Sequence, residues 1–478
     1  MELIVAVDKS WGMAKDNTIP WKFSTDMKYF MNVTKTTSDI NKQNVVIMGR
    51  KTWDSLPEKY RPLTERINIV ISTTLTNEHT NYHVVNNFEN AVKLSLDYYF
   101  TNKVEKIFVI GGAGVYEEAL HSVLLQKVHV TLINKNYECD LQFPKQLLLQ
   151  KCWNDMSLQK DVVEKEVDLS FMIFQPKREF KGEDQYLNLL WNTYNNGDRR
   201  QTRNHMCIST FGGSLEFDLN DGFPMITTKK LFLRGIFEEL RFFLMGDTNS
   251  NHLSDKGVNI WKPNSTREFL DSCGLVNYMV GELGPIYGYN WRFFNAPYEG
   301  SDADYTGKGI DQFANIIDEL KKNKYSRRIL MTTLNPATVK ECVLWPCHGI
   351  VVQFHCGAGG KLNCCMFQRS IDSVVGFSYN MASYAMLVHI VCNIVNNSDD
   401  YTGEKYTPGV LKMYLGDVHI YDEPTHINAL KDHLSRKPYP FPKFEFKNII
   451  KSIDDLKWED VNIINYKSHP AIKVNMVA

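Results

Sequence analysis

The sequence lacks the features of several specialised classes of protein. Its charges nearly cancel, with 54 Lys and Arg against 55 Asp and Glu, so a general binder of nucleic acids or membranes is not expected. No apolar stretch reaches the roughly 18 to 20 residues that a membrane-spanning helix needs. The opening residues, MELIVAVDKSWG, hold a short apolar run broken by Asp8 and no cleavage site. Neither a membrane partner nor a nucleic-acid substrate is predicted.

The cysteines lack the arrangement of a disulfide framework or a metal site. Ten occur, but none forms a CxxC pair or another paired ligand spacing. Thiols stay reduced inside cells, whereas secreted proteins pair them. We therefore expect free thiols, no metal and a cytoplasmic location. The length of 478 residues and the hydrophobic content of 43% are ordinary for a globular protein of two or three domains.

The chain has two halves of different texture. In residues 1–175 the runs LIVAV, NVVIMG, INIVIS and KIFVIGG are apolar throughout, which is typical of strands covered on both faces. They predict an α/β domain with a mostly parallel central sheet flanked by helices. Residues 176–182 are charged and short, and predict a linker. Residues 183–478 mix long helices with strands and predict a second domain, whose first helix should end at Gly197.

The stretch GMAKDNTIPWKFSTDMKYF contains the first candidate site. Ser24 could cap a helix that carries Met27 and Phe30 on one face. Asp26 falls in the first turn of that helix. One interpretation is an acid favoured there by the helix dipole. The other is a carboxylate in an apolar cleft that includes Trp21.

Two strand–glycine–helix junctions could bind an anion. In VVIMGRKTW, residues 50–52 follow Gly49 and combine cations with free backbone N–H groups; a solvated basic turn is the alternative. In KIFVIGGAGVYEEAL, residues 111–114 include three glycines that would let a backbone approach a phosphate. Their spacing is not the usual dinucleotide fingerprint.

Together, IVAVDKSWGMAKDNTIPW, VIMGRKTWDSLP, PLTERINIVIS, FVIGGAGVYE and VTLINKNYECDLQFP resemble dihydrofolate reductase, in order, over essentially all of residues 1–175. The resemblance implies that NADPH delivers a hydride to the pterin ring of dihydrofolate. Asp26 would hydrogen-bond the amino edge of the pterin and favour protonation of its ring nitrogen. Arg66 would pair with the glutamate carboxylate of the folate.

The same resemblance implies two sets of binding residues in the first half. Those that would bind folate are Ile4, Val5, Ala6, Asp26, Met27, Phe30, Leu63, Arg66, Ile110 and Thr131. Those that would bind the cofactor are Ala6, Gly12, Trp21, Gly49, Arg50, Lys51, Thr52, Ser72, Thr73, Ile110, Gly111, Gly112, Ala113, Gly114, Val115 and Tyr116.

In the second half, LWPCHG places Cys347 beside a histidine. A thiol nucleophile needs a cationic, partly desolvated setting, and Arg369 is a candidate partner. The alternatives are an inert core thiol and a structural ion pair. Asn380 begins a helix-like run or caps it. His419 and Tyr421 alternate on a predicted strand and should share a face.

From about residue 183 the chain resembles thymidylate synthase, which implies an α+β fold. The motifs are DGFPMITTKKLFLRGIFEEL, GDTN, GELGPIYGYNWR, SRRIL, PCH, FQRSID, YNMASYA and GDVHIY. A single chain with these two halves in this order resembles the bifunctional dihydrofolate reductase–thymidylate synthases. The resemblance implies that Cys347 attacks C6 of dUMP, which makes C5 nucleophilic toward 5,10-methylenetetrahydrofolate. This folate gives both its one-carbon unit and a hydride, leaving dTMP and dihydrofolate.

The resemblance also assigns roles in the synthase half. Asn380 would read the uracil edge, Asp372 would contact the pterin, and Arg327 and Arg328 would reach the phosphate from the other subunit of a homodimer. The catalytic residues would be Cys347, Arg369, Glu239, Asn380, Asp372, His419 and Tyr421, beside Asp26 of the reductase. The dUMP-binding residues would be Arg203, Arg327, Arg328, His348, Gln368, Arg369, Ser370, Asp372, Asn380, His419 and Tyr421. The folate-binding residues of this half would be Trp261, Tyr287, Asp372 and Gly376.

The chain departs from the synthase pattern in its phosphate loop. The family reads Arg-Thr-Gly-x-Gly where this chain has RRQTRNHMCISTFG, so both loop glycines are absent and Thr202 occupies the arginine position. Arg203 is the expected substitute, with Arg200 behind it. Other departures are Trp345, Leu334 and Lys262. They leave open an alternative in which an active reductase is carried on a silent, synthase-like dimerisation module.

Overall fold

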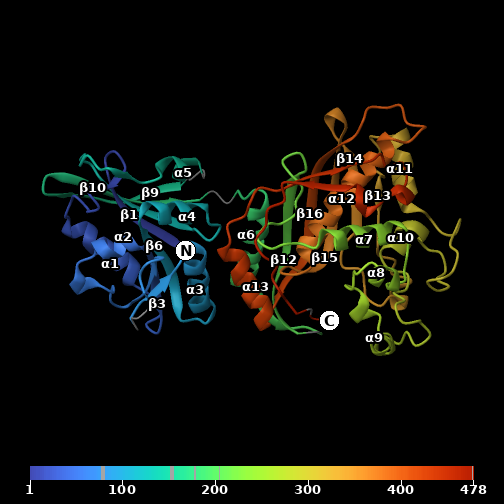
Figure 1. Ribbon diagram of the computed structural model, residues 1–478, viewed down its shortest axis with the longest axis horizontal. Helices are drawn as coiled ribbons and strands as arrows, with labels where there is room; N and C mark the ends of the chain where they lie inside the picture. The colour runs from blue at the N-terminus through green and yellow to red at the C-terminus, as the bar shows by residue number, and fades with distance from the viewer. Residues whose placement is uncertain (77–80, 151–154, 177–178, 204, 476, 478) are drawn as a thin grey trace. The chain divides into compact units, whose positions relative to one another are not determined.

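The structure is a computed structural model that describes residues 1–478 except 77–80, 151–154, 177–178, 204, 476 and 478 (Figure 1). It divides into two compact units. Unit 1 comprises Met1–Phe180 with Lys431–Lys437, and unit 2 comprises Lys181–Leu430 with Pro438–Ala478. The division falls within the predicted linker 176–182, of which residues 177–178 lie outside the described part. The predicted domain limits remain predictions.

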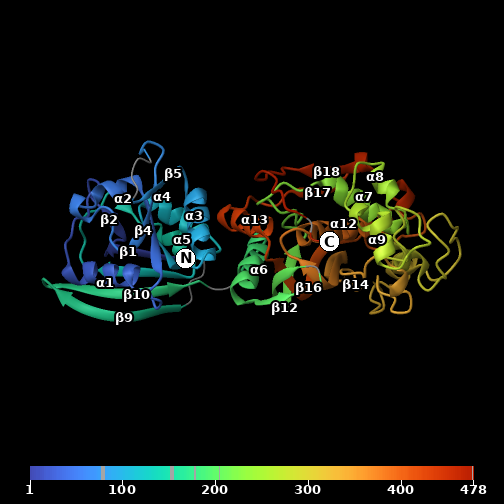
Figure 2. The ribbon, with the colours of Figure 1, turned by 90° about the horizontal axis from the view of Figure 1, so that it is seen from below.

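Unit 1 is built on an eight-stranded sheet of order β5-β4-β3-β6-β1-β7-β10-β9. Every pair from β5 to β7 is parallel, and only β7–β10 and β10–β9 are antiparallel. The long β9–β10 hairpin is visible in Figure 2. The strands are β1 (Glu2–Asp8), β3 (Gln43–Gly49), β4 (Arg66–Ile71), β5 (His83–Val85), β6 (Val104–Gly111), β7 (Lys127–Ile133), β9 (Asp155–Glu164) and β10 (Val167–Gln175), with a separate pair β2 (Gly12–Ala14) and β8 (Leu141–Gln142). The mostly parallel α/β sheet is as predicted.

Helices bury both faces of this sheet. Val46 and Met48 of β3 face a core cluster with Trp53 of α2, and α1 contributes aromatic residues to it. Val45 and Ile47 point to the opposite face and are also fully buried. The helices are α1 (Ser24–Lys35), α2 (Arg50–Ser55), α3 (Phe88–Phe100), α4 (Ala113–His121) and α5 (Lys145–Gln150). Continuous apolar strands therefore have the two-sided cover that their sequence predicts.

The predicted cap of α1 is wrong in one respect. Ser24 is the first helical residue, and the N-cap position belongs to Phe23, which makes no side-chain cap. Glu164, at the end of β9, accepts hydrogen bonds from the backbone N–H groups of Ser24 at 2.8 Å and Thr25 at 3.0 Å. These bonds lower the pKa of Glu164 to about 2. A carboxylate from a distant strand thus satisfies the free N–H groups of the helix.

Unit 2 is built on a six-stranded sheet of order β11-β12-β16-β15-β14-β13. Only β15–β16 is parallel. The strands are β11 (Asp198–Gln201), β12 (Met206–Asp218), β13 (Leu330–Met331), β14 (Val351–Cys356), β15 (Lys361–Asp372) and β16 (Thr407–Tyr421), with a separate hairpin β17 (Lys443–Phe446) and β18 (Val461–Ile464). A largely antiparallel sheet with segregated helices is the α+β class that was expected.

One long helix, α12 (Phe377–Asn396), packs on the sheet of unit 2 and is buried along most of its length. It begins one turn before Asn380, so the prediction that Asn380 starts or caps this helix is wrong. The other helices are α6 (Glu183–Asn196), α7 (Leu233–Leu244), α8 (Asn251–Ser254), α9 (Arg267–Ser272), α10 (Gly288–Phe293), α11 (Gln312–Lys322) and α13 (Pro424–Ser435). Helix α6 ends at Gly197, its C-cap, as predicted.

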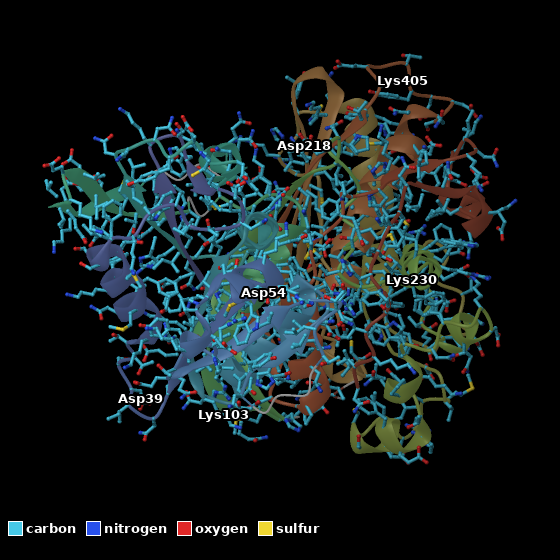
Figure 3. The ribbon with its side chains drawn as sticks, turned by 60° about the vertical axis from the view of Figure 1, so that its left-hand side comes forward. Asp39, Asp54, Lys103, Asp218, Lys230 and Lys405 are labelled. Atoms are coloured by element: carbon cyan, nitrogen blue, oxygen red, sulfur yellow. The ribbon has the colours of Figure 1, made fainter. Side chains whose placement is uncertain are left out.

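The surfaces of both units carry charges of both signs. Asp54, Lys103, Asp218 and Lys405, for example, are exposed (Figure 3). Within the described ranges, no helix combines the length and the apolar character needed to cross a membrane. The described cysteines are all free thiols.

Candidate active sites

In unit 1, Asp26 lies half-buried in the first turn of α1. Burial raises its pKa; a hydrogen bond from Thr131 of β7 opposes the rise, and the charge of Glu164 adds to it. Because burial outweighs any stabilisation of the charge at the helix terminus, the structure favours the apolar cleft over the dipole interpretation. Nearby in sequence, Trp21 is buried and its Nε1 has no hydrogen-bond partner among the described residues. Such an N–H is rare and is available to a ligand.

The predicted pterin pocket is only partly assembled from the predicted residues. Ile4, Leu63 and Ile110 belong to one buried cluster, against which Phe30 packs. Met27, by contrast, is 52% exposed and does not join this cluster. Its predicted contact with folate remains a prediction.

In strand β1, only one residue is not buried, and it lies at the candidate site. Val5 is buried, whereas Ala6 is the only residue of Glu2–Asp8 that is not. Ala6 pairs with Thr131 of β7, the residue whose side chain bonds Asp26. The sheet therefore brings Ala6, Thr131 and Asp26 together, from three elements far apart in the sequence.

Arg66 begins β4, with its guanidinium tied to unit 1. Its Nη1 donates to Thr34 Oγ1 at 2.7 Å and its Nε donates to the Thr64 carbonyl at 3.1 Å. Burial lowers the pKa of Arg66. The group is anchored in one orientation with donors to spare, which suits a carboxylate ligand.

The two glycine-rich junctions lie at the ends of strands β3 and β6, which are parallel neighbours in the sheet. Gly49 and Gly112 precede α2 and α4 as their N-caps and provide no side-chain cap to the first N–H groups of these helices, at one edge of the sheet. Gly111 has φ of 128°, and a Cβ added at Gly114 would meet nothing within 4 Å. This cradle of backbone N–H groups and open space fits the phosphates of NADPH.

Other predicted cofactor residues have structural partners. Ser72 is buried, and its Oγ accepts from the N–H groups of the turn that follows. Arg50 donates to Thr74 Oγ1 at 2.5 Å, and the Tyr116 hydroxyl donates to the Ile4 carbonyl at 2.8 Å. A Cβ at Gly12 would lie 2.3 Å from Cys139 Cβ, so close packing explains this glycine. The remaining predicted cofactor residues lie in the same junctions and in the turn after β4. They are Lys51, Thr52, Thr73, Ala113 and Val115.

In unit 2, Cys347 is partly exposed and held against Tyr287. The Cys347 N–H donates to the Tyr287 hydroxyl at 3.0 Å, and that hydroxyl lies 3.2 Å from Sγ. Burial raises the pKa of Cys347, whereas Tyr287 and the positive charge of Arg369 lower it. Desolvation is the largest of these influences on the thiol, and the role of Cys347 as a nucleophile remains a prediction. A guanidinium is nevertheless nearby, as expected.

His348, next to the thiol, is a neutral structural residue. Burial lowers its pKa to about 3. Its Nδ1 lies 2.8 Å from the Tyr384 hydroxyl, and its carbonyl accepts from Thr333. Its ring stacks on Tyr287 at 4.4 Å. His348 thus fixes the ring that holds Cys347.

Strand β15 is attached to the cysteine loop and carries four predicted dUMP residues, Gln368, Arg369, Ser370 and Asp372. The N–H of Arg369 donates to the Cys347 carbonyl at 2.8 Å, and that of Ser370 to the same oxygen at 3.4 Å. Gln368 is fully buried and accepts from the side chain of Asn380 at 3.1 Å. Asn380 is thereby oriented by a neighbour on the sheet.

An acidic residue, Glu239, lies close to the thiol of Cys347. Glu239 of α7 accepts from Trp261 Nε1 at 2.9 Å. Burial raises the pKa of Glu239 to about 7, and the Trp261 bond opposes the rise. The charge of Glu239 in turn raises the pKa of Cys347. The carboxyl is thus close to half-ionised at neutral pH, as a group that exchanges protons should be.

His419 and Tyr421 lie on one face of β16, with ring centroids 5.1 Å apart. His419 Nδ1 is 2.9 Å from Asp417 Oδ1. Arg200 forms an ion pair with the same Asp417 and donates to Ser209 at 2.7 Å. Arg200 is therefore engaged on the sheet.

The remaining predicted arginines lie on the surface. Arg203 is exposed beside residue 204, which is outside the described part. Arg327 and Arg328 immediately precede the edge strand β13 and are exposed. Neither Arg327 nor Arg328 forms an ion pair with a carboxylate within the described ranges of this chain.

Several residues at this site were not found from the sequence. Lys229 is buried, donates to the Val374 carbonyl at 2.9 Å, and has its pKa lowered by burial to about 8. His426 is buried against Asp372. Asp417 lies within the quoted motif GDVHIY and His426 just after it, but no spacing marks either one. Gly376 precedes α12 as its N-cap. Among the described residues, no three His, Cys, Asp or Glu gather to hold a metal.

A glycine-rich cradle and a half-buried carboxylate in one unit, and a cysteine among polar groups in the other, define an enzyme with two active centres. The dihydrofolate reductase family model matches residues 1–178, and the thymidylate synthase family model matches residues 184–478.

Curated relatives span both halves. A putative bifunctional dihydrofolate reductase-thymidylate synthase of Oryza sativa subsp. japonica is 34% identical, over 97% of this chain and 99% of its own. Bifunctional dihydrofolate reductase-thymidylate synthase 1 of Arabidopsis thaliana is 35% identical over 99% and 95%. The bifunctional enzyme of Leishmania major is 35% identical over 99% and 94%.

The chain belongs to the family of bifunctional dihydrofolate reductase–thymidylate synthases. It therefore has two enzyme activities, one that uses NADPH and one that uses methylenetetrahydrofolate. The reading as a silent synthase-like module is not favoured.

Proposed function

We propose that Cys347 is the nucleophile of the synthase reaction and that Asp26 is the pterin-binding carboxylate of the reductase. The observation that carries the first assignment is the contact of the Cys347 sulfur with Tyr287, beside Arg369. A thiol used only for packing would have no need of a hydroxyl and a guanidinium together.

In the proposed synthase reaction, Sγ of Cys347 bonds to C6 of dUMP and loses its proton to the surrounding polar groups. The electron pair released at C5 attacks the one-carbon unit of methylenetetrahydrofolate. Loss of the C5 proton to a base and cleavage of the bond between the one-carbon unit and the folate nitrogen then leave a methylene group on C5. A hydride from the folate reduces this methylene to a methyl group, which oxidises the folate to dihydrofolate. Elimination of Cys347 releases dTMP and dihydrofolate.

The proposed roles of neighbouring residues follow from their positions. Asn380, held by Gln368, can present both a donor and an acceptor to the uracil edge. His419 and Tyr421 share a face of β16 and can hold a sugar hydroxyl. Glu239 can exchange a proton near neutral pH.

In the reductase, NADPH supplies the hydride. Asp26 accepts hydrogen bonds from the amino edge of the pterin and, because burial raises its pKa, retains a proton more readily than an exposed acid. Ala6 and Thr131 form the sheet wall beside it. Arg66 receives the folate glutamate.

For the phosphate loop, we favour Arg203 over Arg200. Arg200 is already paired with Asp417 and Ser209, and moving it to a phosphate would break both of these contacts. Arg203 lies in the loop between β11 and β12, two residues from the end of β11. A loop without glycine makes a restricted backbone there.

A homodimer is supported by the uncovered face of the unit 2 sheet. Tyr414, Phe367 and Val351 are direct neighbours across β16, β15 and β14, and all are exposed. Leu330 of β13 continues this face, next to Gln353. An apolar row across four strands is not expected to stay in water. Because Arg327 and Arg328 flank β13, a partner bound to this face would receive them.

The test is covalent trapping. Purified full-length protein is incubated with fluoro-dUMP and methylenetetrahydrofolate, and the adduct is sought by mass spectrometry, with Cys347→Ala as control. We expect an adduct only on the unmodified protein, at Cys347. Its absence there would instead support the silent synthase-like module. The free thiols also support a cytoplasmic location, which cell fractionation can check.

A further inference from the structure

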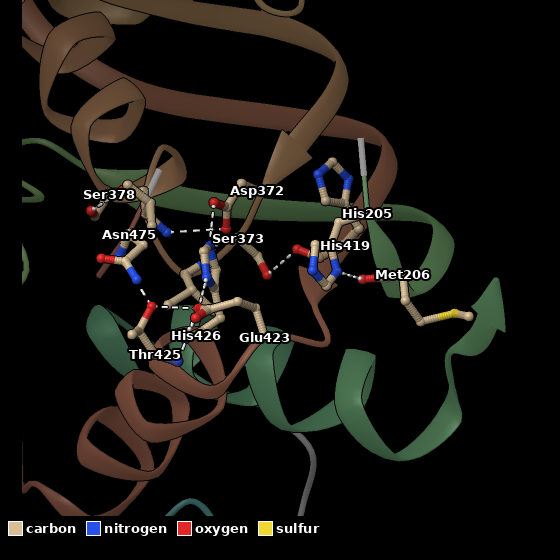
Figure 4. A network of polar contacts seen from close by, with 12 residues as sticks. His205, Met206, Asp372, Ser373, Ser378, His419, Glu423, Thr425, His426 and Asn475 are labelled. Atoms are coloured by element: carbon tan, nitrogen blue, oxygen red, sulfur yellow. Dashed lines mark hydrogen bonds and ion pairs between the residues drawn. The ribbon is translucent and has the colours of Figure 1, made fainter. Parts of the chain in front are cut away.

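A buried histidine links two carboxylates behind the synthase site. His426, in the first turn of α13, has no exposed surface. Its Nε2 lies 3.0 Å from Asp372 Oδ2, and its Nδ1 lies 3.2 Å from Glu423 Oε2 (Figure 4). No role follows for it from the proposed reaction, in which it touches no substrate.

The geometry fixes the protonation of the ring. A neutral imidazole has one donor and one acceptor nitrogen, but both nitrogens of His426 face carboxylate oxygens. Either the ring carries two protons, or one carboxyl is protonated. Hydrogen bonds from Thr425, its hydroxyl first, hold the pKa of Glu423 at about 2, so Glu423 is ionised. Burial opposes a charge on His426, but Asp372 and Glu423 outweigh it and raise its pKa.

Asp372 is almost saturated by these contacts. Its Oδ1 accepts from the N–H groups of Val374 at 3.0 Å and Val375 at 3.2 Å. Its Oδ2 accepts from His426. A carboxylate has about four acceptor positions, so one remains, on the oxygen that His426 holds. The direction in which Asp372 can receive a ligand donor is therefore set by the histidine.

We propose that His426 is a positioning residue of the synthase: as a doubly protonated imidazolium braced by Glu423, it orients Asp372 to accept an N–H of the folate pterin. This inference rests on the proposed synthase function and on the pterin contact that the family resemblance implies for Asp372. The cation also offsets the desolvation of Asp372. Loss of His426 should thus weaken productive folate binding more than dUMP binding.

The surroundings of His426 contain few other groups that could explain its charge. Tyr421 of β16 packs its ring edge-on at 5.3 Å. Lys229 interacts with Asp372 from the other side. The N–H of Asn475 bonds to Thr425 at 3.0 Å, which supports the turn that holds Glu423 (Figure 4). From these elements, Asp372 and Glu423 are the anions that face the ring.

The experiment compares His426→Gln and Glu423→Gln with His389→Gln, in the full chain. His389 is a partly buried histidine of unit 2, packed between Phe223 and Phe444. Steady-state dTMP formation is measured over pH, with dUMP binding in the absence of folate. We expect kcat/KM for methylenetetrahydrofolate to fall roughly 10- to 100-fold in His426→Gln, as for the loss of a charged hydrogen bond. We expect dUMP binding, for which Asp372 is also a predicted contact, to change much less than this.

Glu423→Gln provides the readout that a structural role would not move. In the unmodified protein, activity with folate should decline as rising pH removes the proton from His426. Without the Glu423 charge the pKa of His426 falls, so this decline should begin at lower pH. His389→Gln should show neither effect.

Three results would overturn the inference. If kcat/KM for methylenetetrahydrofolate were the same in His426→Gln and the unmodified protein, Asp372 would not depend on His426 for its orientation. Parallel losses in His426→Gln and His389→Gln, including dUMP binding, would mean a structural role only. If the unmodified protein forms neither dTMP nor the fluoro-dUMP adduct, the proposed function itself fails, and this inference with it.

Discussion

The hydroxyl of Tyr287 binds both the backbone and the sulfur of Cys347, at 3.0 Å from N and 3.2 Å from Sγ. Tyr287 precedes α10 with φ of 41°, in a region of backbone space that non-glycine residues rarely occupy. Its ring is stacked between Phe243 at 5.0 Å and His348 at 4.4 Å. The unusual conformation is thus maintained by packing, and its result is a hydroxyl aimed at the thiol.

Tyr287→Phe should slow covalent bond formation and shift its pH dependence. The hydroxyl lowers the pKa of Cys347, so its removal raises that pKa, and the thiolate forms only at higher pH. We expect adduct formation with fluoro-dUMP at pH 7 to slow roughly 10- to 100-fold, as for a lost hydrogen bond to a charged group. The rise of rate with pH should move upward. A variant with the original rate and profile would refute this role.

Asp26→Asn should remove the reductase activity and leave the synthase active. An amide of the same shape cannot exchange a proton with the pterin, and general acid–base groups contribute typically 10²- to 10⁴-fold. NADPH oxidation with dihydrofolate should fall by about that factor at pH 7, while dTMP formation is unchanged. Cys347→Ala should do the reverse. If either change silenced both activities in folded protein, the division of roles between the halves would be wrong.

Glu239→Gln should remove one limb of the pH–rate profile of the synthase. Burial raises the pKa of Glu239 to about 7, so the group is protonated below that pH and ionised above it. If the carboxylate acts as a base, the rate rises through pH 7 in the unmodified protein. In the amide variant, the rate should be lower and level across this range. A limb that persists near pH 7 would belong to another group.

The strands of both sheets were the part of the fold most open to prediction from sequence. Apolar runs such as NVVIMG fill buried strands, and the alternation of His419 with Tyr421 placed them on one face. Local sequence signals predicted the starts of helices less well. Ser24 resembles a cap, yet Glu164 supplies the capping oxygens from 140 residues away. A cap borrowed from another element leaves no local pattern.

The candidate sites could be predicted only where a motif surrounds the residue. Cys347 and Asp26 were found in this way. Tyr287 was found only through the family resemblance, since its bond to Cys347 spans 60 residues. His426 was missed because a single histidine has no spacing to distinguish it from an ordinary core residue. Its role depends on two carboxylates that packing brings to its ring.

Glu183 connects the start of α6 to the rest of unit 2. One oxygen of its buried carboxylate accepts from the N–H and hydroxyl of Thr227 at 2.7 and 2.6 Å, and the other accepts from those of Thr228 at 2.9 and 2.6 Å. Glu183→Ala leaves these donors unpaired, at about 1–3 kcal/mol for each buried group. With four such donors, we expect the unfolding free energy of the synthase unit to fall by at least about 4 kcal/mol, measured by urea titration. Asp318→Ala, which breaks an exposed pair with Lys322, should cost less than about 1 kcal/mol.

The uncovered sheet face gives the last prediction, on subunit cooperation. Phe367 is 40% exposed in the middle of the apolar row, so Phe367→Asp would place a charge in the proposed interface and should convert dimers to monomers in sedimentation experiments. Synthase activity should be lost with the dimer, since Arg327 and Arg328 would no longer reach a phosphate, whereas NADPH oxidation should continue.

Mixing two inactive proteins isolates the contribution of the arginines. Cys347→Ala retains both arginines, and a protein with Arg327→Ala and Arg328→Ala retains the nucleophile. If the arginines act across the interface, each mixed dimer has one complete site and one lacking both features. Random re-association makes half of the dimers mixed, so activity should recover to about a quarter of that of the unmodified protein. If the arginines acted within their own chain, each site in a mixed dimer would still lack one component, and no activity would return.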